Sequence, residues 1–175
     1  MNDADPTLAT LLAKDAIREL ALLYSRGVDR KDGALLRTLY TNDATDTHGD
    51  TFDGPADAYV DFLERSFPYM RYSGHHICNH LIAVAGDRAE GEVYALAFHV
   101  IPDGKGGWQE DLMAVRYLDH YRKEDGRWKF AKRVVTYDYK APRRPVPAPP
   151  DTVAPGDDRS AGLLMDRLFA RGPRA

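Results

Sequence analysis

The 175-residue sequence contains one cysteine, Cys78, and two tryptophans, and neither sign of charge dominates it. A single cysteine excludes an intrachain disulfide and a zinc site built from several thiolates, which agrees with a reducing compartment. Lys and Arg total 24 against 27 Asp and Glu, so the sequence has no excess of positive charge with which to bind nucleic acid. No apolar run approaches the length of a membrane span, and the first residues lack a signal-peptide pattern. We expect a cytoplasmic protein that binds neither nucleic acid nor a membrane.

The length suits one domain with a core large enough to enclose a pocket. Most of the eleven prolines lie after residue 140, which marks a change in composition. We therefore expect a folded domain over residues 1–140 and a Pro-rich tail over 141–175. The tail should run extended before a possible short helix, SAGLLMDRLFA, and it could serve as a lid or as an arm onto a neighbouring subunit.

Hydrophobic periodicity predicts three helices followed by four strands. The helices cover residues 7–28, 32–40 and 55–67, with "FDGP" as a turn before the third. The strands cover 72–84, 89–101, 108–123 and 127–139, separated by the turns AGD, PDGKGG and EDG. Helices followed by hairpin-connected strands predict an α+β domain, in which a curved antiparallel sheet wraps around helices and forms a cone.

The stretch "SGHHICNH" places three histidines within eight residues. On a regular strand, His75, Ile77 and Asn79 would face one way, and His76, Cys78 and His80 the other. The second set reads H-x-C-x-H, but its outer members would stand roughly 13 Å apart on a straight strand, too far to hold one ion. We expect no metal site, and we expect this set to be half-exposed or to face another subunit.

His75 is the candidate base, because histidine gains and loses protons near neutral pH when a partner fixes its tautomer. Asp29, at the end of the first predicted helix, could accept a hydrogen bond from one ring nitrogen and leave the other free. Each residue has a structural alternative. His75 could be an ordinary strand histidine, and Asp29 could cap the next helix at "DRKDG".

Three segments together resemble the SnoaL-like branch of the nuclear transport factor 2-like superfamily. They are "LALLYSRGVDRKDGALL", "HHICNHLIAVAGDRAEGEVYALAFH" and "YRKEDGRWKFAKRVVTYDY", and they span about residues 10 to 140. The resemblance implies a cone of curved sheet closed by helices. The most similar patterns are those of hexachlorocyclohexane dehydrochlorinase, scytalone dehydratase and bile acid 7α-dehydratase, which are lyases that work without a cofactor.

The resemblance also implies roles for individual residues. Asp29 and His75 would form the catalytic dyad, and Arg133 would stabilise departing negative charge. Tyr24 matches the helix tyrosine of the bile acid dehydratase, and His99 resembles the second histidine of scytalone dehydratase. Tyr24 could equally be a core residue, and His99 and Arg133 could face a subunit contact. Alternation along its strand would put Arg133 on one face with Ala131, Val135 and Tyr137.

These residues together predict a cofactor-independent lyase, most simply a dehydratase, that acts on a hydrophobic aromatic, phenolic or steroid-like small molecule. The substrate would contact a lining that we expect to include His99, Phe67, Met113, Tyr117 and Tyr137. A carbon–carbon lyase that releases formaldehyde needs the same base. An isomerase, a polyketide cyclase, an epoxide hydrolase or a non-catalytic ligand-binding module on the same fold remain alternatives. By analogy with the family we expect a homo-oligomer, a dimer or a trimer.

Overall fold

A computed structural model describes residues 7–147 and 158–164 of the chain. Its three main helices are α1 (Leu8–Asp29), α2 (Gly33–Thr38) and α3 (Ala56–Ser66), and a short 3-10 turn, η1 (Phe67–Tyr69), follows α3. Side chains cap the first two, because Thr7 accepts a hydrogen bond from the Thr10 amide and Asp32 accepts one from the Leu35 amide. The three predicted helices are therefore confirmed.

Within the described residues the sheet contains seven strands: β1 (Tyr40–His48), β2 (Phe52–Pro55), β3 (Tyr72–Ala85), β4 (Arg88–Pro102), β5 (Trp108–Glu124), β6 (Arg127–Lys140) and β7 (Arg144–Val146). The order is β2-β1-β6-β5-β4-β3, and β7 pairs with β5. The four predicted strands are β3 to β6, and they form the expected antiparallel meander. The α+β prediction is confirmed.

The sheet is mixed, which corrects the prediction of a purely antiparallel one. β1 pairs in parallel with β6, and "FDGP", predicted as a turn, is β2. The segment YTNDATDTH lacks hydrophobic alternation, because its buried positions include Thr41 and Asp46. Its strand character comes from pairing with β6 and not from local pattern.

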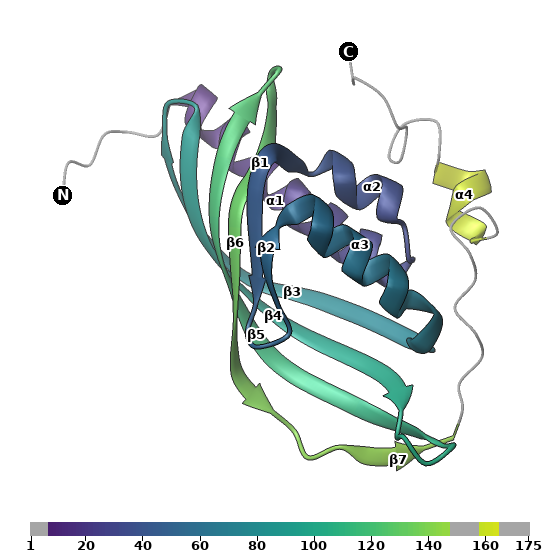
Figure 1. Ribbon diagram of the computed structural model, residues 1–175. Helices are drawn as coiled ribbons and strands as arrows, with labels where there is room; N and C mark the ends of the chain where they lie inside the picture. Colours follow the sequence, from purple (N-terminus) through teal and green to yellow (C-terminus); the bar gives the residue numbers. More distant parts are fainter. Residues whose placement is uncertain (1–6, 148–157, 165–175) are drawn as a thin grey trace.

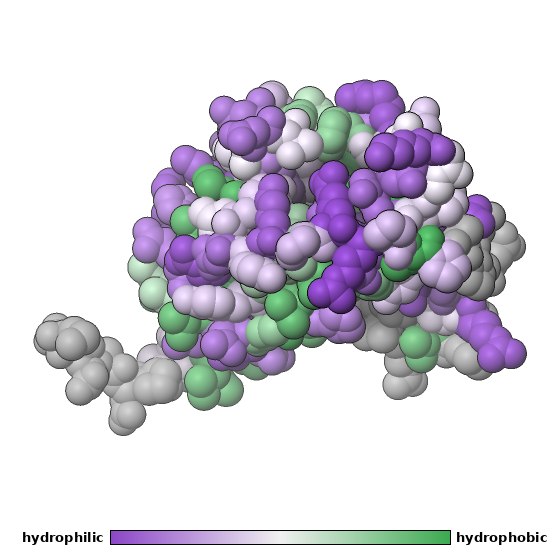
Figure 2. Space-filling view, turned by 90° about the horizontal axis from the view of Figure 1, so that it is seen from below, coloured by the Kyte–Doolittle hydropathy of each residue, from purple (hydrophilic) through white to green (hydrophobic). Residues whose placement is uncertain are grey.

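The sheet bends strongly and holds α1 and α3 against its concave face (Figure 1). One core cluster joins the helices to the sheet through residues such as Ile17, Leu36, Val60 and Phe130, each fully buried. A second cluster lies among β4, β5 and β6. Figure 2, which views the molecule from below, shows hydrophobic residues interspersed with hydrophilic ones on that face. The curvature leaves room between sheet and helices for a pocket.

Register irregularities interrupt the regular alternation of side chains at several points, and two of these β-bulges bear on the site. Cys78 and Asn79 of β3 stand opposite the single residue Tyr94 of β4, and Ala131 of β6 has no direct partner on β5. A bulge reverses the faces of all residues beyond it. His80 therefore lies on the inward face with His75, and Phe130 points inward with Arg133. Both placements correct the alternation predicted from the sequence.

The described part of the tail packs against its own chain. Arg143 forms two hydrogen bonds to the carboxylate of Asp111, both 3.1 Å, beside the pairing of β7 with β5. The short helix α4 (Arg159–Leu164) follows Asp158, whose carboxylate lies 3.1 Å from Arg30 at the end of α1. The rest of the predicted final helix lies outside the described residues. A role of residues 141–175 as a lid or inter-subunit arm stays a prediction.

Candidate active site

A cavity of about 170 Å³ lies between the concave face of the sheet and helices α1 and α3. Apolar and aromatic side chains provide most of its wall, and polar groups enter it at a few points. The lining includes Tyr24 and Val28 from α1, Phe62 and Leu63 from α3, and Met113 and Val135 from the sheet. A mostly apolar cavity with few polar groups is the usual form of a small-molecule site.

Asp29 and His75 meet at one wall of this cavity. The Nδ1 atom of His75 lies 2.6 Å from Asp29 Oδ1, and the His75 amide donates to Asp29 Oδ2 at 2.9 Å. The Ser73 hydroxyl also donates to Asp29 Oδ1, at 3.0 Å. His75 lines the cavity, and among the described residues its Nε2 has no hydrogen-bond partner. The carboxylate thus orients the ring with one nitrogen directed to the cavity.

The environment keeps Asp29 ionised. Burial alone would raise the pKa of the Asp29 carboxyl, but hydrogen bonds from His75 and Ser73 outweigh it, so this pKa lies below its usual value. The helix-capping alternative for Asp29 is wrong, because Asp32 supplies the cap of α2. The carboxylate of Asp29 is therefore available to accept from His75 Nδ1–H.

His99 lies beside His75, with ring centroids 5.2 Å apart, and it also lines the cavity. Its Nε2 is buried without a hydrogen-bond partner among the described residues. Burial, together with the nearby His75, lowers the pKa of His99 to about 4. At neutral pH His99 is therefore an uncharged imidazole that can accept or donate a hydrogen bond to a ligand.

The buried neutral His99 should make stability depend on pH. Histidine in an unfolded chain has its ordinary pKa of about 6.5, whereas the native state protonates His99 only near pH 4. The unfolded state therefore binds more protons between these values, and stability is lost as pH falls through this window. We expect His99 to account for about 1–2 kcal/mol of unfolding free energy lost between pH 7 and pH 5.

Urea denaturation at pH 7 and pH 5 measures this contribution. His99→Gln should reduce the difference between the two pH values, whereas the control His120→Gln, at an exposed position, should not. Part of the difference should remain in His99→Gln, because burial also lowers the pKa of His80 to about 4. Equal pH dependence in His99→Gln and wild type would contradict the assignment.

Besides His75 and His99, four further predicted site residues line this cavity: Tyr24, Met113, Tyr117 and Tyr137. Phe67 does not. It follows α3 and packs into the core with 6% of its surface exposed, while Phe62, Leu63, Ser66 and Met70 present their side chains to the cavity instead. The prediction that Phe67 lines the cavity is therefore wrong. The chain leaves the α-helix for a 3-10 turn at this residue, which changes the direction of its side chain.

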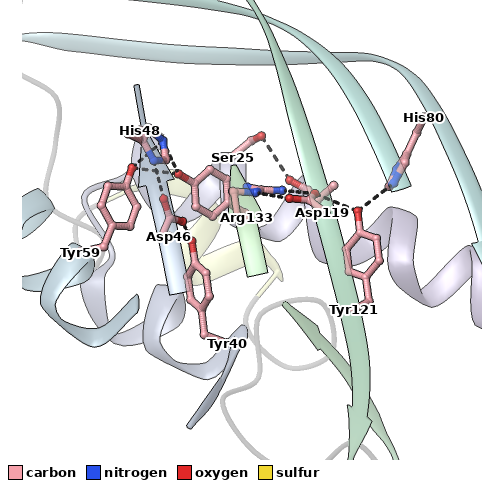
Figure 3. Close-up of polar contacts among 11 residues, drawn as sticks. Ser25, Tyr40, Asp46, His48, Tyr59, His80, Asp119, Tyr121 and Arg133 are labelled. Atoms are coloured by element: carbon pink, nitrogen blue, oxygen red, sulfur yellow. Dashed lines mark hydrogen bonds and ion pairs between the residues drawn. The ribbon is translucent and has the colours of Figure 1, made fainter. Parts of the chain in front are cut away.

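Arg133 lies on the inner side of the sheet but behind the cavity wall. It is fully buried and forms two hydrogen bonds to Asp119, at 2.8 and 2.7 Å (Figure 3). Its guanidinium lies 4.2 Å from the centre of the Tyr24 ring and 4.3 Å from that of Tyr117. These rings line the cavity, whereas Arg133 does not. The prediction that Arg133 faces the ligand directly is therefore wrong.

The hydrogen-bond network around Arg133 continues toward β3. Asp119 Oδ2 accepts from the Tyr121 hydroxyl at 2.9 Å, and that hydroxyl lies 3.2 Å from His80 Nε2. The predicted H-x-C-x-H set is therefore divided, since Cys78 is exposed and His80 turns inward. His80 belongs to a buried network next to the site.

Sequence reasoning missed a second Asp–His pair on β1. His48 lines the cavity, and its Nδ1 lies 2.5 Å from Asp46 Oδ1. The Tyr59 hydroxyl, also on the cavity wall, lies 2.9 Å from His48 Nε2 (Figure 3). The signal was the spacing D-x-H, which places both side chains on one face of a strand. It was overlooked because residues 40–48 were not predicted to be a strand.

A curved α+β domain that encloses an apolar cavity with acid–base side chains is a fold for binding small molecules. The family model of the SnoaL-like domain matches residues 9–134, so the chain belongs to the SnoaL-like family. The predicted resemblance is confirmed. A comparison with curated protein sequences found no match.

Solved structures agree with this family. A candidate scytalone dehydratase from Novosphingobium aromaticivorans is 25% identical, with a TM-score of 0.68 over 80% of this chain and 93% of its own. LinA is 25% identical, with a TM-score of 0.72 over 82% of this chain and 98% of its own. A hexachlorocyclohexane dehydrochlorinase, LinA type 2, is 24% identical, with a TM-score of 0.70 over 85% and 98% of the two chains. These neighbours support an enzyme within this fold family.

Within residues 7–147 and 158–164, the longest helices are too short or too polar to cross a membrane.

Proposed function

We propose that this protein is a cofactor-independent lyase that eliminates water from an aromatic or phenolic small molecule. The observation that carries the proposal is the Asp29–His75 pair: His75 lines an apolar cavity, and its Nε2 has no hydrogen-bond partner in the described part of the chain. His75 acts as the base that removes a proton from carbon, and Asp29 holds the ring in the tautomer that leaves Nε2 free. The match to LinA and to the candidate dehydratase supports the reaction type.

The cavity favours a substrate with one aromatic ring. Its volume of about 170 Å³ is close to the roughly 150 Å³ of an engineered cavity that binds benzene. A four-ring steroid skeleton is larger than this cavity. Aromatic walls from Tyr117 and Tyr137 suit a flat ring, and His99 offers a hydrogen bond to a substrate oxygen. We therefore favour the aromatic or phenolic class over the steroid-like class.

Negative charge that develops on the substrate needs stabilisation. Burial alone would lower the pKa of Arg133, but Asp119 raises it well above its usual value, so the guanidinium stays charged. Its charge acts on the cavity through the rings of Tyr24 and Tyr117, 4.2 and 4.3 Å from it. Low-dielectric surroundings strengthen such an interaction. Elimination by these groups requires neither a metal nor an organic cofactor.

The predicted homo-oligomer also belongs to the proposal. Leu81, Leu96, Leu112 and Leu118 are exposed on the sheet by 65, 45, 39 and 37% respectively. Alternation puts these side chains on the outer face, opposite the cavity. Contact between outer faces of two or three copies would cover them.

The test uses EDTA-treated wild-type protein and a panel of single-ring compounds in deuterated water. The panel contains β-hydroxy ketones, among them the benzaldehyde–acetone aldol, and phenolic diols, with a hydroxysteroid as the larger comparison. We expect elimination, measured as enone absorbance and loss of water by mass spectrometry, from single-ring members only. A formaldehyde assay detects carbon–carbon cleavage.

Deuterium uptake at carbon without elimination would contradict the proposal in favour of an isomerase. Binding without turnover would favour a ligand-binding module.

A further inference from the structure

The histidines of two Asp–His pairs line the cavity from different parts of the sheet. His75 comes from β3 and His48 from β1, and three strands, β6, β5 and β4, lie between them in the sheet order. The intervening wall is mainly apolar, with Val135 on β6, Met113 on β5 and Ala97 on β4, and His99 of β4 lies at its edge beside His75. A substrate on this apolar wall would therefore have one acid–base group on each flank.

The β1 pair is built to hold and deliver a proton. Asp46 is fully buried; its Oδ1 lies against His48 Nδ1, and its Oδ2 accepts from the Tyr40 hydroxyl at 2.7 Å. The carboxylate thus holds the proton on Nδ1 and leaves Nε2 to exchange a proton with the group in front of it. His48 Nε2 is directed to the Tyr59 hydroxyl, and the two rings stack with centroids 4.4 Å apart.

Among the residues of this network, Tyr59 is the one whose hydroxyl can donate a hydrogen bond to the substrate. Its hydroxyl lies 3.1 Å from that of Tyr24, and both residues line the cavity. Burial, with Tyr24 and Asp46 nearby, raises the pKa of Tyr59 well above its usual value. The phenol therefore keeps its proton at neutral pH and needs a proton source once it has given that proton away.

We infer that Tyr59 is the catalytic acid that protonates the leaving oxygen, that the His48–Asp46 pair resupplies its proton, and that the natural substrate therefore loses a hydroxyl group and not a halide. This inference rests on the proposed elimination at His75. A halide departs with its electron pair and needs no proton, whereas hydroxide is a poor leaving group until it is protonated. A second, dedicated acid is useful only in the second case.

The proposed step balances as follows. His75 Nε2 takes the proton from carbon, and the electron pair of that C–H bond forms the C=C bond. The C–O bond breaks, and the leaving oxygen keeps its electron pair and takes the Tyr59 proton, so that water departs. Tyr59 recovers a proton from Nε2 of the His48 imidazolium, which becomes neutral with its remaining proton on Nδ1. Exchange with water then returns one proton to His48 and removes one from His75, which closes the cycle.

The experiment compares two substrates that differ only in the leaving group. One is the benzaldehyde–acetone aldol, and the other is the corresponding β-chloro ketone, so both give the same enone. The variants are His48→Gln, Tyr59→Phe and His75→Gln, with the half-exposed Tyr94→Phe as the control. Circular dichroism and thermal melting establish that each variant is folded, and uncatalysed elimination is subtracted.

We expect His48→Gln and Tyr59→Phe to lower kcat on the hydroxy ketone by about 10²-fold or more. Both should stay within about threefold of wild type on the chloro ketone, where no acid is needed. His75→Gln should lose both reactions. This dependence on the leaving group separates proton supply from a structural role, which would affect both substrates alike.

The remaining outcomes overturn the inference in distinguishable ways. Equal losses on both substrates in His48→Gln, or no loss on either, would leave the proposed lyase standing and remove the role of His48. Turnover of the chloro ketone alone by wild type would show that the substrate class is a halide. Turnover of neither substrate by wild type would count against the proposed function as well.

Discussion

Asp29→Asn is expected to lower kcat/KM by about 10³–10⁴-fold, on any panel compound that the wild-type protein converts. In wild type, Asp29 accepts from His75 Nδ1 at 2.6 Å. An asparagine can present its NH₂ group instead, which favours the tautomer with the proton on Nε2. The ring would then have no free nitrogen toward the cavity, and the base would be lost without any change in shape. The loss corresponds to about 4–5.5 kcal/mol of transition-state stabilisation.

The matched control is Asp32→Asn, three residues along the chain. Asp32 caps α2 through the Leu35 amide, and asparagine is an equally good N-cap, so this variant should retain activity and fold. KM should change little in Asp29→Asn, because the carboxylate lies behind His75 and does not line the cavity. Activity of Asp29→Asn within about tenfold of wild type would rule out the dyad.

Asp119→Asn is expected to lower the free energy of unfolding by about 3–5 kcal/mol. Asp119 and Arg133 are both fully buried and form two hydrogen bonds. Removal of the negative charge leaves an uncompensated guanidinium in the core, where water cannot solvate it. Because native proteins are stable by only about 5–15 kcal/mol, the midpoint of urea denaturation should move far toward lower concentration.

Two further variants identify the cause of that loss. Asp119→Asn combined with Arg133→Gln removes both charges and should recover much of the lost stability. Asp138→Asn breaks the exposed ion pair with Arg116, and its effect should be much smaller because water screens that pair. A loss in Asp119→Asn no greater than in Asp138→Asn would mean that the buried pair contributes little to stability.

Much of the fold could be predicted because local patterns and tertiary structure agree. The apolar stripe of α1, through Ile17, Leu20 and Tyr24, faces the core as the helical period requires. The four long strands end at the predicted turns, where Gly86 and Gly126 adopt positive φ. β1 escaped prediction because a strand with buried Thr41 and Asp46 has no hydrophobic alternation. Because β1 was not predicted as a strand, Asp46 and His48 were not recognised as neighbours on one face.

The candidate site shows the same division. Asp29 and His75 were paired from residue chemistry and from the family resemblance, and the structure brings them together. Their catalytic role stays a prediction. Phe67, by contrast, was expected on the lining as the last residue of the predicted helix 55–67, but the chain forms a 3-10 turn from this residue on. Arg133 was placed on the correct side of the sheet, but spacing could not show that Asp119 holds it behind the tyrosine rings.

By itself, the sequence determined the helices, the antiparallel meander, the family and the candidate base, because period, turn chemistry and residue type are local properties of the chain. Only the tertiary structure decided which side chains share the cavity. Bulges at Cys78–Asn79 and Ala131 turn His80 and Phe130 inward. Parallel pairing with β6 brings His48 to the same wall. A one-residue shift in register reverses a face, and such shifts depend on contacts between strands that are distant in sequence.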